Sequence, residues 1–293
     1  MKTKERILYW DVIKALTIFL VIYAHGLQFF TNDNNYWQKD FTCQFIISFH
    51  MPLFMIISGY FANSIFNQNF QTILYKKSRQ LLLPSISTYF LVGIALMALR
   101  NQNLFTHIDN LLFFCAQSFW FLKALFVYYI IASLYRIIYL KSRIFYYITI
   151  LGTFLCIRIL PPQYVDFVHI TTMFPYFIIG LLFYNYQDKI FKNHKLIMTL
   201  SLMIFLILSH FWQSNEYNIY THPIEWNSQY LRLYLIRTII GTTGSLSIIL
   251  IIKKILYKQN SNWVTKIAQI GNATLGIYIF QYFIIARFIN LKC

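Results

Sequence analysis

Residues 7–30 read ILYWDVIKALTIFLVIYAHGLQFF, an apolar run long enough to cross a bilayer as an α-helix. Three ionisable residues, Asp11, Lys14 and His25, interrupt this run. At about 100° per residue their side chains fall on nearly the same stripe, and about 16 Å separates Lys14 from His25 along the helix axis. Because charge inside a membrane is costly, such a stripe normally lines a watered cavity enclosed by protein. The run therefore predicts a functional polar face.

Composition places the whole chain in the same class as this run. Of its 293 residues, 58% are hydrophobic and 12% are charged, about half the charged fraction of a soluble domain. We predict an all-α fold, a polytopic transmembrane helical bundle of about 9–10 spans that forms a single membrane-embedded domain over residues 1–293. Hydropathy places nine spans near 7–30, 41–66, 81–99, 119–140, 144–160, 170–186, 195–212, 231–252 and 267–290.

The formal net charge of +16 raises the question of nucleic-acid binding, but its distribution favours another origin. Basic loops alternate with neutral or acidic loops along the chain, beginning with Lys2, Lys4 and Arg6. This alternation follows the positive-inside rule, so we predict a cytoplasmic N-terminus and no nucleic-acid partner. The four cysteines form no CxxC pair, and we predict neither a redox role nor a metal site for them.

His25, Lys14 and Asp11 are the candidate catalytic residues. A histidine can accept the proton of a sugar hydroxyl and so make its oxygen nucleophilic. A lysine can neutralise a phosphate, a carboxylate or the neighbouring Asp11. The alternative is a structural ion pair beside a histidine that donates to a backbone carbonyl. Three ionisable residues on one face favour the functional interpretation.

His50 is a further candidate, in the stretch SFHMPLFMIISGY over residues 48–60. Pro52 is expected to kink this span and to open room beside His50. Ser58 and Gly59 are small residues that allow another helix to approach closely, so packing is the better explanation for them.

A basic loop, YKKSRQLLLP over residues 75–84, leads into the next span. Its Lys76, Lys77 and Arg79 suit the phosphates of a cytosolic donor such as coenzyme A. On spacing alone, topology signalling and contact with anionic lipid explain them better.

Polar residues within the other spans are candidates for lining a cavity. Lys123, which follows Trp120, and Arg237 lie below the predicted ends of their spans. Three other arginines lie near the predicted outer ends, where long side chains can snorkel, and these are Arg158, Arg232 and Arg287.

Lys14 followed by ten residues and His25 is similar to the R/K-x10-H signature of the acyltransferase-3 family, a family of polytopic membrane O-acyltransferases. Further stretches resemble the family's landmarks in the same order along nearly the whole chain. They are Phe49-His50-Met51-Pro52, Ser58-Gly59-Tyr60, Lys77-Ser78-Arg79, Leu83-Pro84, Trp120-Phe121-Leu122, Phe174-Pro175-Tyr176, Gly180 and GNATLGIYIFQ over residues 271–281.

The chain departs from the family pattern in two places. Gln281 stands where the late motif commonly has a histidine, and a glutamine can hydrogen-bond but cannot carry a proton at neutral pH. The chain also stops soon after this motif, where many relatives have one more span, so we expect a short or truncated member.

The resemblance implies transfer of an acyl group, with acetyl expected, from acyl-coenzyme A to a hydroxyl of a cell-envelope polysaccharide or lipid-linked saccharide. His25 would act as general base or as acyl relay, and Lys14, held by Asp11, would engage the donor or developing charge. The acyl-coenzyme A contacts would be Lys76, Lys77 and Arg79, and the cavity for the acceptor would be lined by His50, Trp120, Lys123, Arg237, Tyr278 and Gln281.

The implied setting is the inner membrane of a bacterium, with a multi-pass chain, membrane lipid around it and no tightly bound cofactor. Acetyl-coenzyme A is expected as the acyl donor. The rival interpretation is a transporter or flippase that passes a saccharide or small solute along the same polar face. A third is an assembly subunit without activity, which predicts that apolar replacements of Lys14 and His25 are harmless.

Overall fold

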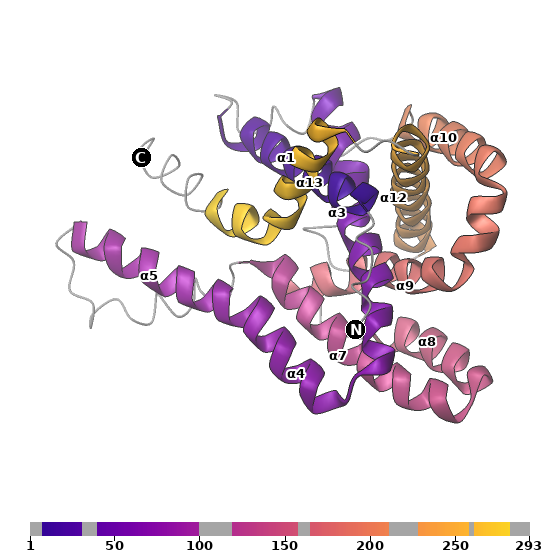
Figure 1. Ribbon diagram of the computed structural model, residues 1–293, viewed down its shortest axis with the longest axis horizontal. Helices are drawn as coiled ribbons and strands as arrows, with labels where there is room; N and C mark the ends of the chain where they lie inside the picture. Colours follow the sequence, from indigo (N-terminus) through magenta and orange to yellow (C-terminus); the bar gives the residue numbers. More distant parts are fainter. Residues whose placement is uncertain are drawn as a thin grey trace. The chain divides into compact units, whose positions relative to one another are not determined.

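The computed structural model of the protein describes residues 8–30, 40–99, 119–157, 165–210, 228–257 and 261–281. Within these ranges the regular structure is helical and contains no strand, which confirms the predicted all-α fold (Figure 1). In chain order the elements are α1 (Leu8–Phe30), α3 (Phe41–Ala62), the 3₁₀ turn η1 (Asn63–Asn67), α4 (Phe70–Lys77), the π-helical turn η2 (Ser78–Leu82), α5 (Leu83–Leu99), α7 (Trp120–Lys141), α8 (Arg143–Ile157), α9 (Val165–Lys192), α10 (His194–His210), α12 (Ser228–Ile255) and α13 (Asn262–Asn272).

Five helices in the described chain are long and apolar enough to cross a membrane. Their apolar segments are Leu8–Leu27, Phe41–Asn67, Trp120–Lys141, Val168–Lys192 and Leu231–Ile255. Helices α5, α8 and α10 also coincide with predicted spans, but their described parts are 17, 15 and 17 residues long. The chain is thus an all-α polytopic protein.

The last predicted span, 267–290, does not form one uninterrupted helix in its described part. Helix α13 begins earlier, at Asn262, and ends at Asn272. A turn at Ala273 follows, and residues 274–281 form a second short helix. Residues 282–290 of the predicted span lie outside the described residues.

The basic stretch predicted as a loop is helical instead. Helix α4, the π-helical turn η2 and helix α5 follow one another directly, and the residues at both junctions, Ser78 and Leu83, keep right-handed helical backbone angles. Lys, Arg, Gln and Leu are good helix formers, so the local sequence supports a helix wherever the surroundings allow one. The loop was inferred from the run of basic residues alone, and that prediction was wrong.

The chain divides into two compact units. The first comprises Met1–Phe61, Tyr176–Asn218 and Glu225–Cys293, and the second comprises Ala62–Pro175 and Ile219–Ile224. Helix α9 contributes to both, because the boundary at Pro175 falls within it. The single domain inferred from the sequence stays a prediction.

In the first unit, the start of α1 packs against the end of α3. The ring centroids of Trp10 and Tyr60 lie 4.4 Å apart. The hydroxyl of Tyr60 donates a hydrogen bond of 2.8 Å to Gln187 on α9. Buried aromatic pairs of this kind supply large apolar contact areas and about 0.5–1.5 kcal/mol beyond them. They anchor this end of the first unit.

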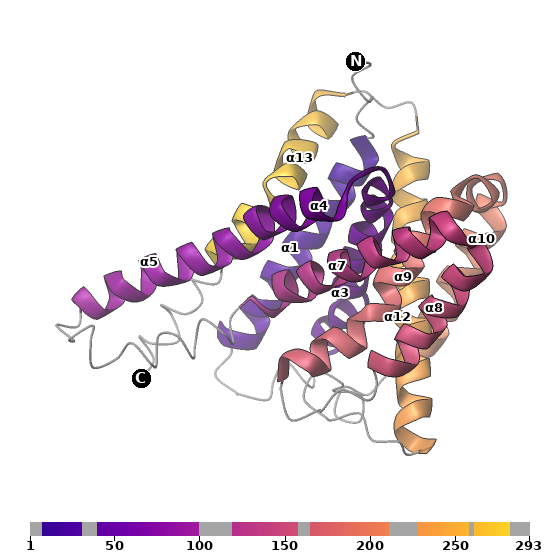
Figure 2. The same ribbon diagram turned by 90° about the horizontal axis from the view of Figure 1, so that it is seen from below.

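Glycines set the distances between helices of the first unit. A Cβ on Gly59 of α3 would meet the backbone carbonyl of Phe177 on α9, and one on Gly180 of α9 would meet that of Ile56. A Cβ on Gly271 of α13 would meet the backbone of Asp11 on α1, the helix beside which α13 runs (Figure 2). Small residues are typical of close contacts between membrane helices. The close packing predicted at Gly59 is confirmed.

Helix α12 completes the surroundings of α3 in the first unit. A Cβ on Gly244 would contact Phe49, and a Cβ on Gly241 would contact the ring of Pro52. The hydroxyl of Ser245 donates to the backbone carbonyl of Gly241 at 2.6 Å. These small residues allow α12 to lie directly against the part of α3 that carries His50.

In the second unit, hydrogen bonds from long side chains to backbone carbonyls connect the helices. Tyr128 of α7 donates to the carbonyl of Ile170 on α9 at 2.6 Å. The guanidinium of Arg136 on α7 donates to the carbonyl of Phe66 in η1 at 2.7 Å. Each bond satisfies a polar group within an otherwise apolar environment, where an unpaired group would be costly.

Candidate functional site

The ion pair predicted on the first helix is present. The ammonium of Lys14 donates to a carboxylate oxygen of Asp11 at 2.8 Å. The Asp11 side chain is 6% exposed and that of Lys14 is 24% exposed. The same ammonium lies 4.9 Å from the centre of the Phe61 ring. Carboxylate and ring together hold the positive charge in place, so Asp11 orients Lys14 as the sequence predicts.

His25, His50 and Arg237 come together from three helices of the first unit. His50 and Arg237 are buried, at 5% and 3% exposure, and His25 is half-buried. The charges of His25 and Arg237 both act on the His50 ring. Three ionisable residues that lie 25 and 187 positions apart along the chain are thus close enough to interact inside the unit. They form a polar cluster in the first unit.

The hydrogen bond of His50 fixes which of its ring nitrogens is available. Its Nδ1 lies 2.8 Å from the backbone carbonyl of Ile46, one turn earlier in α3. A carbonyl only accepts hydrogen bonds, so Nδ1 carries the proton and the neutral ring leaves its lone pair on Nε2. His50 is therefore oriented for an acceptor role at Nε2.

Arg237 is positioned by contacts of its backbone and of its own helix. The hydroxyl of Tyr176 on α9 donates to the carbonyl of Arg237 at 3.0 Å. One turn later, Gly241 lies against both Tyr176 and Pro52. The room that Pro52 was expected to open is thus occupied on this side by α12. The proline serves packing at this contact, and α3 continues as a helix through it.

Tyr278 and Gln281 lie on the short helix that follows α13. Gln281 is buried, at 6% exposure, and its side-chain carbonyl oxygen has no hydrogen-bond partner among the described residues. Tyr278 is half-buried. A buried amide oxygen without a partner is costly, so Gln281 is suited to accept a hydrogen bond from a bound hydroxyl.

The predicted coenzyme A residues lie on consecutive turns of the second unit. Lys76 and Lys77 occupy the last turn of α4, and Arg79 lies in η2. The side chains of Lys76 and Arg79 are exposed. Lys77 is half-buried, and its ammonium lies 3.9 Å above the centre of the Tyr129 ring. Burial, and then the charge of Lys76, lower the pKa of Lys77 to about 8.

Trp120 and Lys123 lie at the start of helix α7, in the second unit. The preceding residue, Phe119, has a left-handed backbone conformation with φ of 52°, which is uncommon for a residue other than glycine. The Trp120 ring stacks on His169 of α9, with centroids 4.4 Å apart and planes inclined by 22°. Lys123 follows one turn later and is half-buried.

His169 is a buried residue that the sequence did not single out. Hydropathy predicts a loop before the sixth span, whereas α9 already begins at Val165 and His169 is 9% exposed. Its position could have drawn attention in the sequence, because it lies in a segment rich in apolar residues and six positions before Pro175. Of the arginines expected to snorkel, Arg232 is exposed, and Arg158 and Arg287 lie outside the described residues.

The predicted residues therefore form two groups, each within one unit. The first unit holds Asp11, Lys14, His25, His50, Arg237, Tyr278 and Gln281. The second holds Lys76, Lys77, Arg79, Trp120 and Lys123. The first group offers a ring nitrogen that can accept a proton, fixed cations and hydrogen-bond acceptors. The second offers cations for an anionic ligand. The assignment of these residues to a reaction stays a prediction.

A family model of known proteins covers nearly the whole chain. The sequence model of the acyltransferase domain, from the acyltransferase-3 family, matches residues 7–291. The nodulation protein NolL of Sinorhizobium fredii (strain NBRC 101917 / NGR234) is 31% identical over 144 residues, which are 46% of this chain and 38% of that protein. The nodulation protein NolL of Mesorhizobium japonicum (strain LMG 29417 / CECT 9101 / MAFF 303099) is 31% identical over 138 residues, 44% of this chain and 36% of that protein.

The similarity to these relatives spans little more than a third of their own length. No solved structure matches the chain significantly.

Proposed function

Since the chain belongs to the acyltransferase-3 family, we propose that it transfers an acyl group, with acetyl expected, from acyl-coenzyme A to a hydroxyl of a cell-envelope saccharide. The acceptor is a polysaccharide or a lipid-linked saccharide, and the chain works in the inner membrane of a bacterium. The observation that supports this most is the electrostatic interaction of His25 and Arg237 with His50 inside the first unit, where His25 shares helix α1 with the Asp11–Lys14 pair.

The reaction needs a base, an anion-stabilising group and a leaving thiolate. His25 accepts the proton of the acceptor hydroxyl while its oxygen attacks the thioester carbonyl. The carbon–sulfur bond then breaks, and the coenzyme A thiolate takes up the proton that His25 holds. Arg237 is a fixed positive charge that can stabilise the developing negative charge on the carbonyl oxygen.

Lys14 and the basic turn have separate roles in this proposal. Lys14, held by Asp11, meets donor or developing charge along the stripe it shares with His25. Lys76, Lys77 and Arg79 bind the phosphates of the donor, because cations on adjacent turns can contact one extended anionic group. In the first unit, His50, Tyr278 and Gln281 contact the acceptor. The assignment of Trp120 and Lys123, in the second unit, to the acceptor stays a prediction from the resemblance.

Donor binding is expected to weaken as the pH rises through 8. The pKa of Lys77 is lowered to about 8, so its side chain is charged at pH 7 and about nine-tenths neutral at pH 9. Loss of this charge should raise the KM for acyl-coenzyme A by up to about tenfold between pH 7 and pH 9. Steady-state kinetics in detergent or nanodiscs, with the acceptor saturating, measures this change.

The matched control is Lys77→Arg, since a guanidinium stays charged over this range. The variant should show a nearly constant KM for the donor from pH 7 to pH 9. An equal rise of KM in the wild type and the variant would show that another group causes the pH dependence.

The function itself is tested by following an acetyl label. Membranes containing the wild-type chain should transfer labelled acetyl from acetyl-coenzyme A into a glycan fraction, and membranes without it should not. The Lys14→Ala variant at matched expression should transfer much less, because the charge that Asp11 orients is lost. Identification of the labelled sugar then names the acceptor.

A second outcome favours the transporter interpretation. If wild-type membranes transfer no label, while deletion of the gene still changes the surface saccharides, the chain moves a saccharide and does not acylate it. Full activity of the Lys14→Ala variant would instead contradict the role given to the ion pair.

A further inference from the structure

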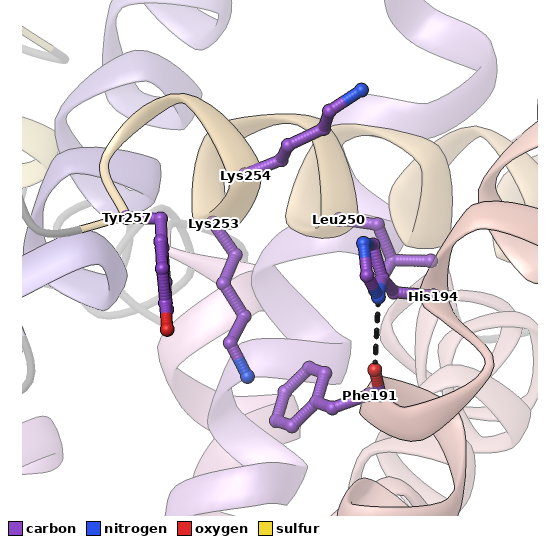
Figure 3. A pocket seen from close by; sticks show the side chains of 6 residues that line it. All are labelled: Phe191, His194, Leu250, Lys253, Lys254 and Tyr257. Carbon is purple, nitrogen blue, oxygen red and sulfur yellow. Dashed lines mark hydrogen bonds between the residues drawn. The ribbon is translucent and has the colours of Figure 1, made fainter.

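A pocket of about 470 Å³ lies in the first unit, apart from the residues of the proposed reaction. It is formed by the last turn of α9, the first residue of α10, the end of α12 and the turn after it. Its lining residues are Phe191, His194, Leu250, Lys253, Lys254 and Tyr257, and none of them is acidic (Figure 3).

Basic groups occupy one part of the pocket and apolar groups the rest. The Lys253 ammonium points to the Phe191 ring and lies over it (Figure 3). It also lies 5.7 Å from the centre of the Tyr9 ring. Aromatic rings hold an ammonium without neutralising it, so it still attracts an anion. The Lys254 ammonium points away from the other lining residues and contributes charge at the edge of the pocket.

His194 contributes a second polar group with a defined orientation. Its Nδ1 lies 3.0 Å from the carbonyl of Phe191, so Nδ1 carries a proton and donates it. His194 is also the first residue of α10, a helix of 17 residues whose first backbone N–H groups carry partial positive charge. The nearby Asp188 acts electrostatically on Lys253 and weakens this positive field without lining the pocket.

The pocket lies at the level where two apolar spans end. The span on α9 ends at Lys192 and the span on α12 ends at Ile255. Tyr257, just beyond, is 69% exposed, as is typical of aromatic side chains at a membrane interface. From this level α10 presents exposed apolar side chains along its length, namely Leu196, Leu200, Met203 and Ile207. A ligand seated here can extend along an apolar surface.

We propose that this pocket binds the headgroup of an anionic phospholipid. The phosphodiester lies against the Lys253 ammonium, near the start of α10, and the glycerol contacts Phe191 and Leu250. The volume suits a glycerophosphate headgroup, and the acyl chains remain outside, against the exposed face of α10. Basic pockets between membrane helices commonly hold such headgroups. Lipid binding here is independent of acyl transfer.

The test is a lipid titration followed by native mass spectrometry of the purified full chain. Phosphatidylglycerol is compared with phosphatidylcholine of the same acyl chains, and 3′-phosphoadenosine 5′-diphosphate represents a nucleotide phosphate. We expect the wild type to prefer phosphatidylglycerol, and the double variant Lys253→Gln/Lys254→Gln to lose about tenfold or more of that affinity.

Two further variants keep the result independent of folding. Lys192→Gln/Lys195→Gln removes the same charge from exposed residues at the junction of α9 and α10 that do not line the pocket, so its affinity should change much less. Asp188→Asn should increase the affinity for phosphatidylglycerol, because it removes the negative charge that acts on Lys253. A misfolded protein would not gain affinity.

Three outcomes would overturn the proposal. Equal losses in the two double variants would mean that surface charge alone attracts the lipid. Equal binding of phosphatidylglycerol and phosphatidylcholine would mean that the pocket does not select an anion. Displacement of phosphatidylglycerol by the nucleotide, with loss of nucleotide binding in Lys253→Gln/Lys254→Gln, would assign the pocket to a soluble phosphate ester.

Discussion

Replacement of His25 by alanine is expected to lower the rate of acyl transfer by about 10²–10⁴-fold, the usual contribution of a positioned general base. The side chain lies on the first helix, is half-buried and is close enough to act electrostatically on His50. The substitution removes the ring without adding bulk, so the helix and the Asp11–Lys14 pair should persist. The loss should therefore appear in kcat, with a small change in the KM for acyl-coenzyme A.

The measurement is the initial rate of label transfer by purified protein at matched concentration and confirmed folding. His210→Ala is the control, because His210 is an exposed histidine at the end of α10. It should retain the wild-type rate. A His25→Ala protein that keeps wild-type kcat would contradict the assignment of the base.

His50 provides an internal comparison for the same experiment. Its Nδ1 already donates to Ile46, so only Nε2 is available to a reacting group. If His50→Ala lowers kcat as far as His25→Ala does, and the double variant is no worse than either, the two rings act as one unit. If His50→Ala is the more damaging of the two, the base is His50.

Substitution of Gly59 or Gly180 by alanine is expected to destabilise the first unit strongly. A Cβ at either position would overlap a backbone carbonyl of the opposite helix, at Phe177 or Ile56. Backbone cannot move aside as a flexible side chain can, so α3 and α9 must separate. The cost should be at least about 1–3 kcal/mol for each substitution, the range for overpacked cores.

Thermal unfolding in a fixed detergent checks this expectation. Gly152→Ala and Gly276→Ala are matched controls, because an added Cβ at either position has no neighbour within 4 Å and both residues are helical. Alanine favours a helix over glycine by up to about 1 kcal/mol, so these controls should be neutral or stabilising. Unchanged unfolding of Gly59→Ala would mean that α3 and α9 are not in backbone contact.

Much of the architecture follows from hydropathy, because apolar runs of about 20 residues cross a bilayer as α-helices, in which every backbone polar group is hydrogen-bonded within the segment. The stripe on the first helix was also predictable, since the positions of Asp11 and Lys14 on a regular helix fix their mutual distance. The meeting of His50 with Arg237 was not. They are 187 residues apart, and small residues on the opposing helix, at Gly241 and Gly244, bring α12 against α3.

Two loops predicted from the sequence are helical. The first was predicted from a run of basic residues, and the second from a helix start that was placed too late. The basic residues 76–79 suggested a loop, whereas their helix propensity and the apolar residues around them produce a continuous helix. The sequence predicts a loop at His169 because the apolar run begins after it, yet stacking on Trp120 compensates for its burial within α9. Local helix propensity explains the first case, and a tertiary contact explains the second.

The π-helical turn at Ser78–Leu82 separates the orientation of helix α4 from that of helix α5. In a regular α-helix the direction of every side chain is set by its number, at about 100° per residue. A π-turn takes up one extra residue, so Lys76 and Lys77 are rotated by about that angle relative to α5. The basic turn therefore faces a different side of the continuous helix than an unbroken α-helix would give it, by about the rotation of one residue.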